Sequence, residues 1–518
     1  MKKIILSFAI FLFVSTSFSQ NVGIGTTQPD ASAKLEITST NSGFLLPRMT
    51  TTQRDAIPSP AIGLIIFNST TNTLEIFTGS WGSVTFSSPQ VKKLFGAGNY
   101  DEGYDVQQTT DGGYIIVGMA AFTANPGTLA GLIFNGGQDG VVIKTDAYGN
   151  VQWQKIFGGS MHDYFMNISL TVDGGYILGG RSYSSNTGTF SGITGNGGSD
   201  FWVLKLNATG NIQWQKLFGG SANETVHSIS QTNDGGYIVA GSSASSNSGT
   251  LTGLLSNGGA TDGCIIKLDA AGSVQWQKLL GGTAEETVTS IRKTIDGGYI
   301  AAGYSLSSNT GTLIGATNNG SSDFWILKLS GNGATQWQKL FGGTGNDFSY
   351  DVLQTKDGGY ITTGSTSSTN SGTLTSLVNN GGSDCWILKL DDFGNFQWQR
   401  LFGGISGDLI QSIKQTLDGG YIMGGYSQSS NTGTLTGILN NGSYDGWVIK
   451  IDVSGGLQWQ KLYGGNLDDY FTNVRQTSDG GYILSGMTSS TNSGNLVGYN
   501  NNGNSDLWLL KLDKSGNQ

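Results

Sequence analysis

One unit of 61 or 62 residues recurs along most of this chain, and it constrains the fold more than any local motif does. Each copy contains the tetrad Asp-Gly-Gly-Tyr, followed by a passage rich in Ser, Asn, Gly and Thr. A period of this length is typical of solenoids and propellers, in which neighbouring copies bury a common core. The seven tetrads begin at Asp111, Asp173, Asp234, Asp296, Asp357, Asp418 and Asp479.

Each unit contains four short apolar or alternating runs. In the third copy they are Val226–Thr232, Tyr237–Ser242, Cys264–Leu268 and Val274–Leu280. Their Ile, Val, Leu, Tyr and Trp side chains suit a pleated sheet, and turn residues bound every run. Asn233–Gly236, for example, supplies the positive-φ positions of a tight hairpin. The unit therefore predicts four antiparallel strands, A to D, which form one blade of a propeller.

The two ends of the repeat region favour a closed ring over an open array. The last copy stops at Gln518, before a strand D begins. A matching strand stands at the other end, because Gln90–Gly96 reads QVKKLFG and aligns with QWQKLFG, with Val91 in the Trp position. A ring uses this strand to remove two open sheet edges. The sequence predicts an all-β fold, with a seven-bladed propeller over residues 90–518.

The first residues predict export. Lys2 and Lys3, the apolar run Ile4–Val14 and the small residues near Ser19 are typical of a secretory signal peptide over residues 1–19. No later segment is apolar enough to predict a transmembrane helix. We expect an extracellular or outer-surface protein, with the periplasm as the alternative. The formal net charge of −9 argues against nucleic acid as a partner.

Residues 20–89 form a separate, small, mostly β head in this prediction. Strands are expected at Lys34–Ile37, Gly63–Asn68 and Thr73–Phe77, and a helical turn at Thr51–Ala56.

Two resemblances extend this picture. VGIGTTQP at Val22–Pro29 and GFLLPRMTTTQRDAI at Gly43–Ile57 resemble the stalk-like start of exported bacterial and phage tail-fibre-like proteins, which implies oligomerisation through the head. Residues 90–518 resemble the beta-propeller repeat family of secreted bacterial proteins through DGGYI, the run closing in Lys-Leu-Asp, and QWQ before LFGG. That resemblance implies a propeller and export, and little about chemistry. A long insert between strands B and C, such as Ser429–Asp445, departs from a simple blade.

Several repeated residues are predicted to be structural. The two tryptophan series are expected to pack between blades rather than to stack on sugars. They are Trp153, Trp214, Trp276, Trp337, Trp398 and Trp459 on strand D, and Trp202, Trp325, Trp386, Trp447 and Trp508 on strand C. The lysines that end strand C are expected to pair with the tetrad aspartates; they are Lys144, Lys205, Lys267, Lys328, Lys389, Lys450 and Lys511. Cys264 and Cys385 lie in different blades and are predicted to be free, buried thiols.

Two series of acids have two interpretations. If strand A is innermost, the D–A and B–C loops share one rim, and all of these acids lie on it. They either cap loop N–H groups or bind a polar ligand or Ca²⁺. The candidate ligand contacts are Asp101, Asp163, Glu224, Glu286, Asp347, Asp408 and Asp469, with His162 and Tyr164. The candidate Ca²⁺ ligands are Asp139, Asp200, Asp262, Asp323, Asp384, Asp445 and Asp506.

Few residues break the repeat symmetry, as a catalytic site would require. His162 and His227 do so, and so does a strand-A series expected to face the channel: Gln107, Ser169, Ser230, Arg292, Leu353, Lys414 and Arg475. The sequence contains no Gly-x-Ser-x-Gly elbow, and the two histidines lie in different blades.

These observations predict a secreted or cell-surface, non-catalytic module for binding, adhesion or scaffolding. Its expected partner is a polar extracellular ligand, either a glycan or a surface protein, with Ca²⁺ as the one cofactor considered. The alternative is a secreted carbohydrate-active enzyme, a glycoside hydrolase or lyase, that uses a pair of rim carboxylates.

Overall fold

The computed structural model describes residues 22–24, 26–28, 33–39, 42–83, 90–121 and 127–518. The predicted signal peptide, residues 1–19, lies outside this part of the chain. The chain divides into two compact units, Met1–Ser87 and Ser88–Gln518. Within the described segments, no helix has the length and apolar character needed to span a bilayer.

The first unit contains two small sheets and one short helix, and its strands are more numerous than the sequence predicted. Helix α1 (Thr51–Asp55) begins with a capping box between Thr50 and Gln53. β1 (Val22–Ile24) pairs in parallel with β2 (Leu35–Ile37), and a four-stranded sheet comprises β3 (Arg48–Met49), β4 (Ile65–Asn68), β5 (Thr73–Phe77) and β6 (Trp81–Ser83). β1, β3 and β6 were not expected, because runs of two or three residues carry little period-2 signal.

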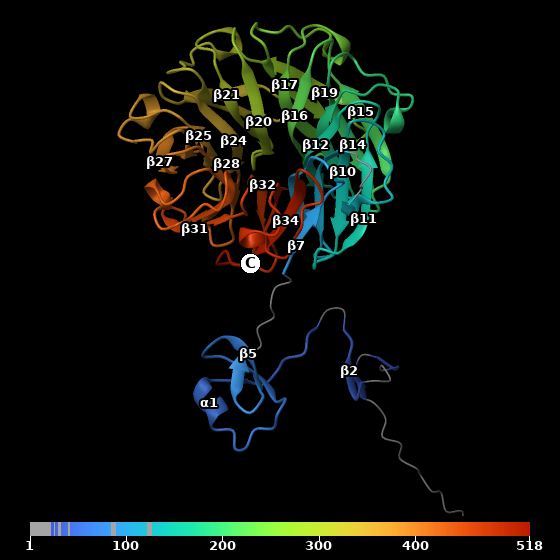
Figure 1. The fold of residues 1–518 in the computed structure, drawn as a ribbon, viewed down its shortest axis with the longest axis vertical. Helices are drawn as coiled ribbons and strands as arrows, with labels where there is room; N and C mark the ends of the chain where they lie inside the picture. Colours follow the sequence, from blue (N-terminus) through green and yellow to red (C-terminus); the bar gives the residue numbers. More distant parts are fainter. Residues whose placement is uncertain (1–21, 25, 29–32, 40–41, 84–89, 122–126) are drawn as a thin grey trace, which may run out of the picture. The chain divides into compact units, whose positions relative to one another are not determined.

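The second unit is a ring of seven four-stranded antiparallel sheets, the predicted propeller (Figure 1). Strand A is β8 (Asp101–Gln108), β12 (Asp163–Leu170), β16 (Glu224–Gln231), β20 (Glu286–Lys293), β24 (Asp347–Gln354), β28 (Asp408–Gln415) and β32 (Asp469–Gln476). Strand B is β9 (Tyr114–Ala121), β13 (Tyr176–Ser182), β17 (Tyr237–Ser243), β21 (Tyr299–Ser305), β25 (Tyr360–Thr366), β29 (Tyr421–Ser427) and β33 (Tyr482–Thr488).

The two outer strands follow in the same order. Strand C is β10 (Gln138–Thr145), β14 (Asp200–Leu206), β18 (Asp262–Leu268), β22 (Asp323–Leu329), β26 (Asp384–Leu390), β30 (Asp445–Ile451) and β34 (Asp506–Leu512). Strand D is β11 (Val151–Phe157), β15 (Ile212–Phe218), β19 (Val274–Leu280), β23 (Thr335–Phe341), β27 (Phe396–Phe402), β31 (Leu457–Tyr463) and β7 (Lys92–Phe95). Strands A and C of the third blade begin two residues earlier than predicted, because their first acids join the ladder opposite Ser243.

Each B–C insert contains one 3₁₀ turn. These turns are η1 (Gly127–Leu129), η2 (Gly188–Phe190), η3 (Gly249–Leu251), η4 (Gly311–Leu313), η5 (Gly372–Leu374), η6 (Gly433–Leu435) and η7 (Gly494–Leu496).

Ring closure is confirmed. β7, from the start of the propeller, pairs antiparallel with β34, from its end, with Leu507 opposite Phe95. The Lys511 N–H donates to the Val91 carbonyl at 2.7 Å, which extends the ladder by one residue. The last blade is thus completed by a strand from the other end of the ring, so β34 has a paired neighbour on both sides.

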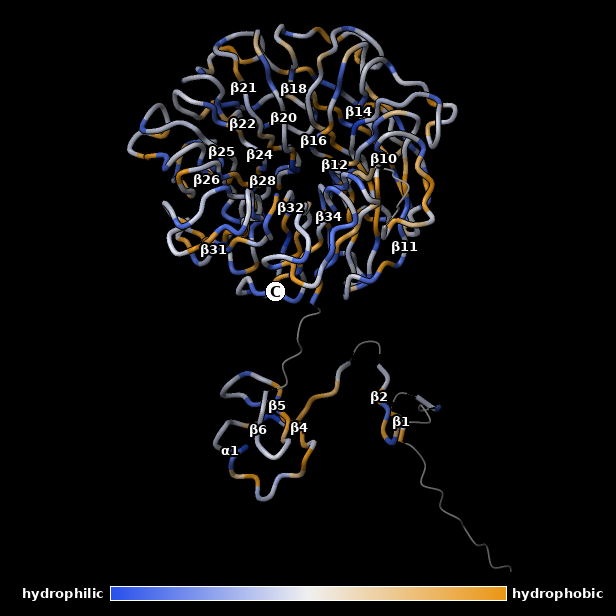
Figure 2. The backbone as a smooth tube through the Cα atoms, in the orientation of Figure 1, coloured by the Kyte–Doolittle hydropathy of each residue, from blue (hydrophilic) through white to orange (hydrophobic). Residues whose placement is uncertain are grey.

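The core lies between neighbouring blades, since one buried cluster joins Ile115 and Val117 of the first blade to Trp202 of the second. Hydrophobic residues recur along the strands throughout the ring (Figure 2). The strand-C tryptophans are fully buried; the Trp386 ring centroid, for example, lies 4.4 Å from that of Phe324 in the preceding blade. The half-buried strand-D tryptophans lie against the C–D turn of the next blade. At Gly210 (φ +75°) an added Cβ would be 2.8 Å from the Trp153 ring, so that turn admits only glycine. Packing between blades is therefore confirmed for both series.

The lysine–aspartate pairs and the free cysteines are also confirmed. Lys205 Nζ lies 2.8 Å from Asp173 Oδ2 and also donates to the Leu206 carbonyl. The ion pair recurs in all seven blades. The lysines are more buried than a surface ion pair would predict, since the Lys205 side chain is only 4% exposed. Cys264 and Cys385 are buried and unbridged.

Every strand A contains a β-bulge, which decides which side chains reach the channel. In β12 the pairing with β13 shifts between Phe165 and Asn167, and the same shift recurs in all seven A–B pairs. A bulge re-aims the side chains on either side of it. The fourth and seventh residues of strand A remain partly exposed along the channel, as does the second in every strand A except β20, whereas the fifth is buried between blades.

Candidate functional site

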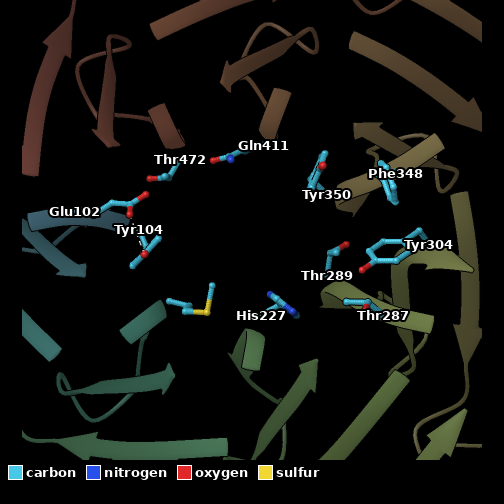
Figure 3. Close-up of a pocket in the computed structure, with 11 residues that line it drawn as sticks. Glu102, Tyr104, His227, Thr287, Thr289, Tyr304, Phe348, Tyr350, Gln411 and Thr472 are labelled. Carbon is cyan, nitrogen blue, oxygen red and sulfur yellow. Dashed lines mark hydrogen bonds between the residues drawn. The ribbon is translucent and has the colours of Figure 1, made fainter. Parts of the chain in front are cut away.

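A cavity of about 520 Å³ occupies the centre of the ring, at the end where strands A begin (Figure 3). All but one of its side chains come from the second and fourth positions of strand A, and Tyr304 comes from β21. The lining residues are Glu102, Tyr104, Met166, His227, Thr287, Thr289, Tyr304, Phe348, Tyr350, Gln411 and Thr472.

The lining is asymmetric, whereas the positions that hold the blades together repeat closely. The fourth residue of strand A differs in chemistry around the ring, with Tyr104 and Tyr350 on opposite sides of the opening in Figure 3. Tyr304 and Phe348 add an edge-to-face pair with ring centroids 4.8 Å apart. A concave site with aromatic walls and a few polar groups is typical of small-ligand binding.

The polar groups of the cavity are partly held in place. The Glu102 carboxylate accepts hydrogen bonds from the hydroxyls of Tyr104 and Tyr470, each at 2.9 Å, while burial raises its pKa. Burial also lowers the pKa of His227 to about 4, and the Arg181 guanidinium adds to this effect. The His227 imidazole is therefore neutral near pH 7, with one nitrogen donor and one nitrogen acceptor.

The first series of rim acids does not face solvent. Asp163 is fully buried, and its carboxylate accepts the Gly159 N–H at 2.7 Å and the Ser184 hydroxyl at 2.8 Å. The prediction that these acids contact a ligand is wrong in this structure, because their oxygens are occupied by the D–A loop and by strand-B hydroxyls. The capping interpretation holds for Asp101, Asp163, Glu224, Glu286, Asp347, Asp408 and Asp469.

The second series is also buried, and each member lies beside a first-series acid of the next blade. Asp139 Oδ2 accepts the Asn135 N–H at 2.7 Å. A Cβ placed on Gly158 would be 2.0 Å from Asp139 Oδ1 and 3.0 Å from Asp163 Oδ2, so the two carboxylates flank this glycine. Burial and the charge of Asp163 raise the pKa of Asp139 to about 6. The pairs are Asp139–Asp163, Asp200–Glu224, Asp262–Glu286, Asp323–Asp347, Asp384–Asp408, Asp445–Asp469 and Asp506–Asp101.

The predicted Ca²⁺ site gains little support from this arrangement. Among the described residues, no three His, Cys, Asp or Glu side chains come together as a metal-binding group. One carboxylate oxygen in six of the pairs has no hydrogen-bond partner within the described part of the chain: Oδ1 of Asp139, Asp262, Asp323, Asp384, Asp445 and Asp506.

His162 and Tyr164 lie outside the central cavity. Their rings stack with centroids 6.5 Å apart, and the Arg181 guanidinium lies 5.0 Å from the Tyr164 ring. The structure therefore places this pair beside the cavity rather than among the residues that line it.

The B–C inserts lie on the same face as the D–A loops, as predicted, and they are anchored to those loops. In the second blade the Thr189 N–H donates to the Gly158 carbonyl at 2.8 Å, and Phe190 is fully buried. Much of each insert therefore stabilises its neighbouring loop. The sequence predicted that the seventh residues of strand A face the channel, but it missed the second and fourth residues that line this cavity. The available signal was the variation at the fourth residue of strand A.

Comparisons with known proteins bear on the head and on the fold. Residues 23–93 match the family described as a phage tail like trimerisation region. The regulatory protein FlaEY of Caulobacter vibrioides is 24% identical over 351 residues, which cover 61% of this chain and 36% of that protein. The chain thus spans about a third of the length of that relative.

Solved structures show low similarity. The WD40 domain of Pan2 from Neurospora crassa is 11% identical with a TM-score of 0.43, over 84% of this chain and 99% of that one. A protein of unknown function from Bacteroides caccae is 11% identical with a TM-score of 0.34, over 64% of this chain and 92% of that one. The assignment of this chain as a propeller rests on its own strand pairing.

Proposed function

We propose that this protein is an exported, non-catalytic binding module that holds a polar extracellular ligand, a glycan, at the mouth of its central channel. The observation that supports this most is the 520 Å³ cavity, whose lining departs from the sevenfold repeat. Tyrosine faces can stack on sugar rings, and the carboxylate, amide and hydroxyl groups can hydrogen-bond sugar hydroxyls. Adhesion or scaffolding at the cell surface follows from such binding, and export rests on the N-terminal sequence pattern.

Binding without turnover is favoured over glycoside hydrolysis. Hydrolysis of glycosides normally uses two carboxyl groups that flank the scissile bond. Glu102 is the one carboxylate among the described residues that line the cavity, and both of its oxygens accept tyrosine hydroxyls. The acids that the enzyme alternative required are buried under the D–A loops.

Replacing Tyr104 and Tyr350 together by alanine is expected to weaken glycan binding at least about tenfold, because truncating a central aromatic contact typically costs about 1–2 kcal/mol or more. A glycan array followed by titration calorimetry measures this. Tyr148→Ala, at an exposed turn on the other face, is the matched control and should bind normally. Unchanged affinity in the double variant would contradict the channel site, and release of reducing ends by the wild type would favour the enzyme.

We also propose that the head assembles the chain into a trimer, on the strength of the family match over residues 23–93. Light scattering of the full chain should give a mass about three times that of one subunit. A variant lacking residues 33–83 should be monomeric and should lose avidity for a polymeric glycan while retaining affinity for a short one. A monomeric full chain would contradict the proposal.

A further inference from the structure

The other end of the channel has a different chemistry. It is lined by the seventh residue of each strand A, next to the A–B turns. Three of these residues are basic and come from β20, β28 and β32: Arg292, Lys414 and Arg475. The remaining members are neutral: Gln107, Ser169, Ser230 and Leu353.

Within the described residues, these three cations share two carboxylates, Asp351 and Asp105. Asp351 accepts hydrogen bonds from Lys414 Nζ at 2.5 Å and from Arg292 Nη2 at 3.1 Å. Arg475 Nη2 lies 3.3 Å from Asp105 Oδ1, and its Nε donates to the Val106 carbonyl at 2.7 Å. One positive charge is therefore left without a carboxylate of its own, although the chain as a whole is acidic.

Neither carboxylate can neutralise the additional charge. Asp351 also accepts the N–H groups of Val352 and Ile413. Burial alone would raise the pKa of Asp351, but Lys414 and Arg292 hold it well below its usual value, so it is already ionised. Asp105 is likewise engaged, by the Asn167 side chain at 2.8 Å and the Ile168 N–H at 3.0 Å.

The basic side chains remain accessible from a hollow. Lys414 and Arg475 line a depression of about 390 Å³ with the adjoining A–B turn residues, and their side chains are 16% and 24% exposed. Burial lowers the pKa of Lys414 to about 8, and repulsion from Arg292 and Arg475 contributes to this. An anion in the hollow would relieve that repulsion. Because Arg475 Nε and Nη2 already bond Val106 and Asp105, the Nη1 side of its guanidinium is the part that suits a planar or tetrahedral oxyanion.

We propose that this hollow between β28 and β32 binds an oxyanion, the carboxylate, sulfate or phosphate group of a ligand, through the Arg475 guanidinium. Lys414 supplies positive charge beside it, since its three N–H groups already donate to Asp351, the Ser412 hydroxyl and the Ile413 carbonyl. Arg292 supports the site from across Asp351 without contacting the ligand. The site lies at the opposite end of the channel from the aromatic cavity. Oxyanion binding here is therefore a separate proposal from glycan binding in that cavity, and each can be tested without the other.

The test uses the full-length protein and titrates sodium sulfate against sodium chloride at equal ionic strength near pH 7, with calorimetry and thermal melting as readouts. The wild type should bind sulfate saturably and melt at a higher temperature in its presence. Lys414→Gln with Arg475→Gln should weaken binding at least about tenfold. Arg475→Lys should retain part of it, and Lys339→Gln on the outer strand β23 should change nothing.

Two further measurements keep the test decisive. Binding should weaken as the pH rises through about 8, where Lys414 loses its proton. If the double variant misfolds, Arg475→Gln alone carries the test, because Asp105 keeps its bonds from Asn167 and Ile168. Tighter binding of glucuronate or a sulfated oligosaccharide than of inorganic sulfate or phosphate would identify an acidic glycan as the source of the group, and equal binding would identify a free ion. No saturable difference between sulfate and chloride, or equal sulfate affinity in wild type and double variant, would overturn the proposal.

Discussion

Deleting Val91–Phe95 is expected to lower the melting temperature of the propeller by about 5–10 °C. Val91, Leu94 and Phe95 are each at most 9% exposed and pack against both the first and the last blades. Burying three such side chains contributes about 5–9 kcal/mol in total. The deletion also removes the ladder with β34 and leaves its buried Leu507–Leu512 edge open to other chains. Thermal melting and light scattering should therefore show a less stable, aggregation-prone protein.

Val91→Trp is the matched control for that deletion. It restores the residue that the other six strands D carry at this position, where Trp153 and its equivalents lie against a glycine of the next blade. Val91 already lies against Gly149, the corresponding glycine of the first blade. The substitution should leave the melting temperature nearly unchanged. A deletion variant that melts like the wild type would mean that the ring does not depend on β7.

Repetition made much of this fold predictable from the sequence. A turn such as Asn233–Gly236 is a weak signal alone, but the recurrence of its Asp-Gly-Gly with a lysine 32 or 33 residues after the Asp indicated both the hairpin and the ion pair. The closing strand was recognisable because QVKKLFG retains the pattern of a strand D. The short strands of the head carry no such repetition, and three of them were missed.

The candidate site was less predictable, for two physical reasons. An acid such as Asp163 looks available in the sequence, but Ser182 and Ser184 fold back onto it and remove it from solvent. Hydroxyl residues recur at a constant distance after most of these acids, so the hydrogen bonds that cap them could have been predicted from the sequence. The channel lining depends on the bulge in strand A, which a sequence pattern of period 2 does not locate. In the sequence, the varying seventh residues of strand A, such as Gln107 and Arg292, and the irregular His227 pointed to the channel, whereas the other fourth-position residues, such as Tyr104, were not recognised.

The propeller is expected to be most stable at mildly acidic pH and to lose stability between about pH 5 and pH 8. Burial raises the pKa of Asp101 to about 7, and burial raises that of Asp323 and Asp445 to about 6, with the paired carboxylate adding to each shift. The unfolded chain releases these protons near pH 4, so their stabilising contribution is full below that pH and is lost as the pH rises through the folded-state values. At each of these interfaces the contribution to the free energy of unfolding should fall by on the order of 1–3 kcal/mol. The melting temperature should therefore fall by several degrees.

The tetrad aspartates act in the opposite direction. Burial alone would raise the pKa of Asp173, but Lys205 and Thr171 lower it to about 2. Its contribution is present above about pH 4 and is lost as the pH falls toward 2. Because the Asp173 side chain is half exposed, solvent screening keeps this contribution below about 1 kcal/mol. Stability should therefore decline on both sides of a maximum near pH 4–5, and more steeply toward alkaline pH.

Replacing Asp323 and Asp445 together by asparagine tests the origin of the alkaline decline. Each substitution removes one of two neighbouring negative charges. It also replaces the unpartnered Oδ1 by an amide NH₂ group, which can donate a hydrogen bond to the remaining carboxylate. The sites lie two blades apart, so their effects should add. The variant should melt higher than the wild type at pH 8 and close to it at pH 5, whereas Asp173→Asn should melt slightly lower at both. Two results together would mean that the carboxylate pairs are ionised and hold a cation. The variant would melt lower than the wild type at pH 8, and the melting temperature of the wild type would rise on adding CaCl₂ and fall with a chelator. In that case Ca²⁺ would bind the carboxylate pairs at the blade interfaces, and the bound cation, rather than protonation, would compensate their buried negative charge.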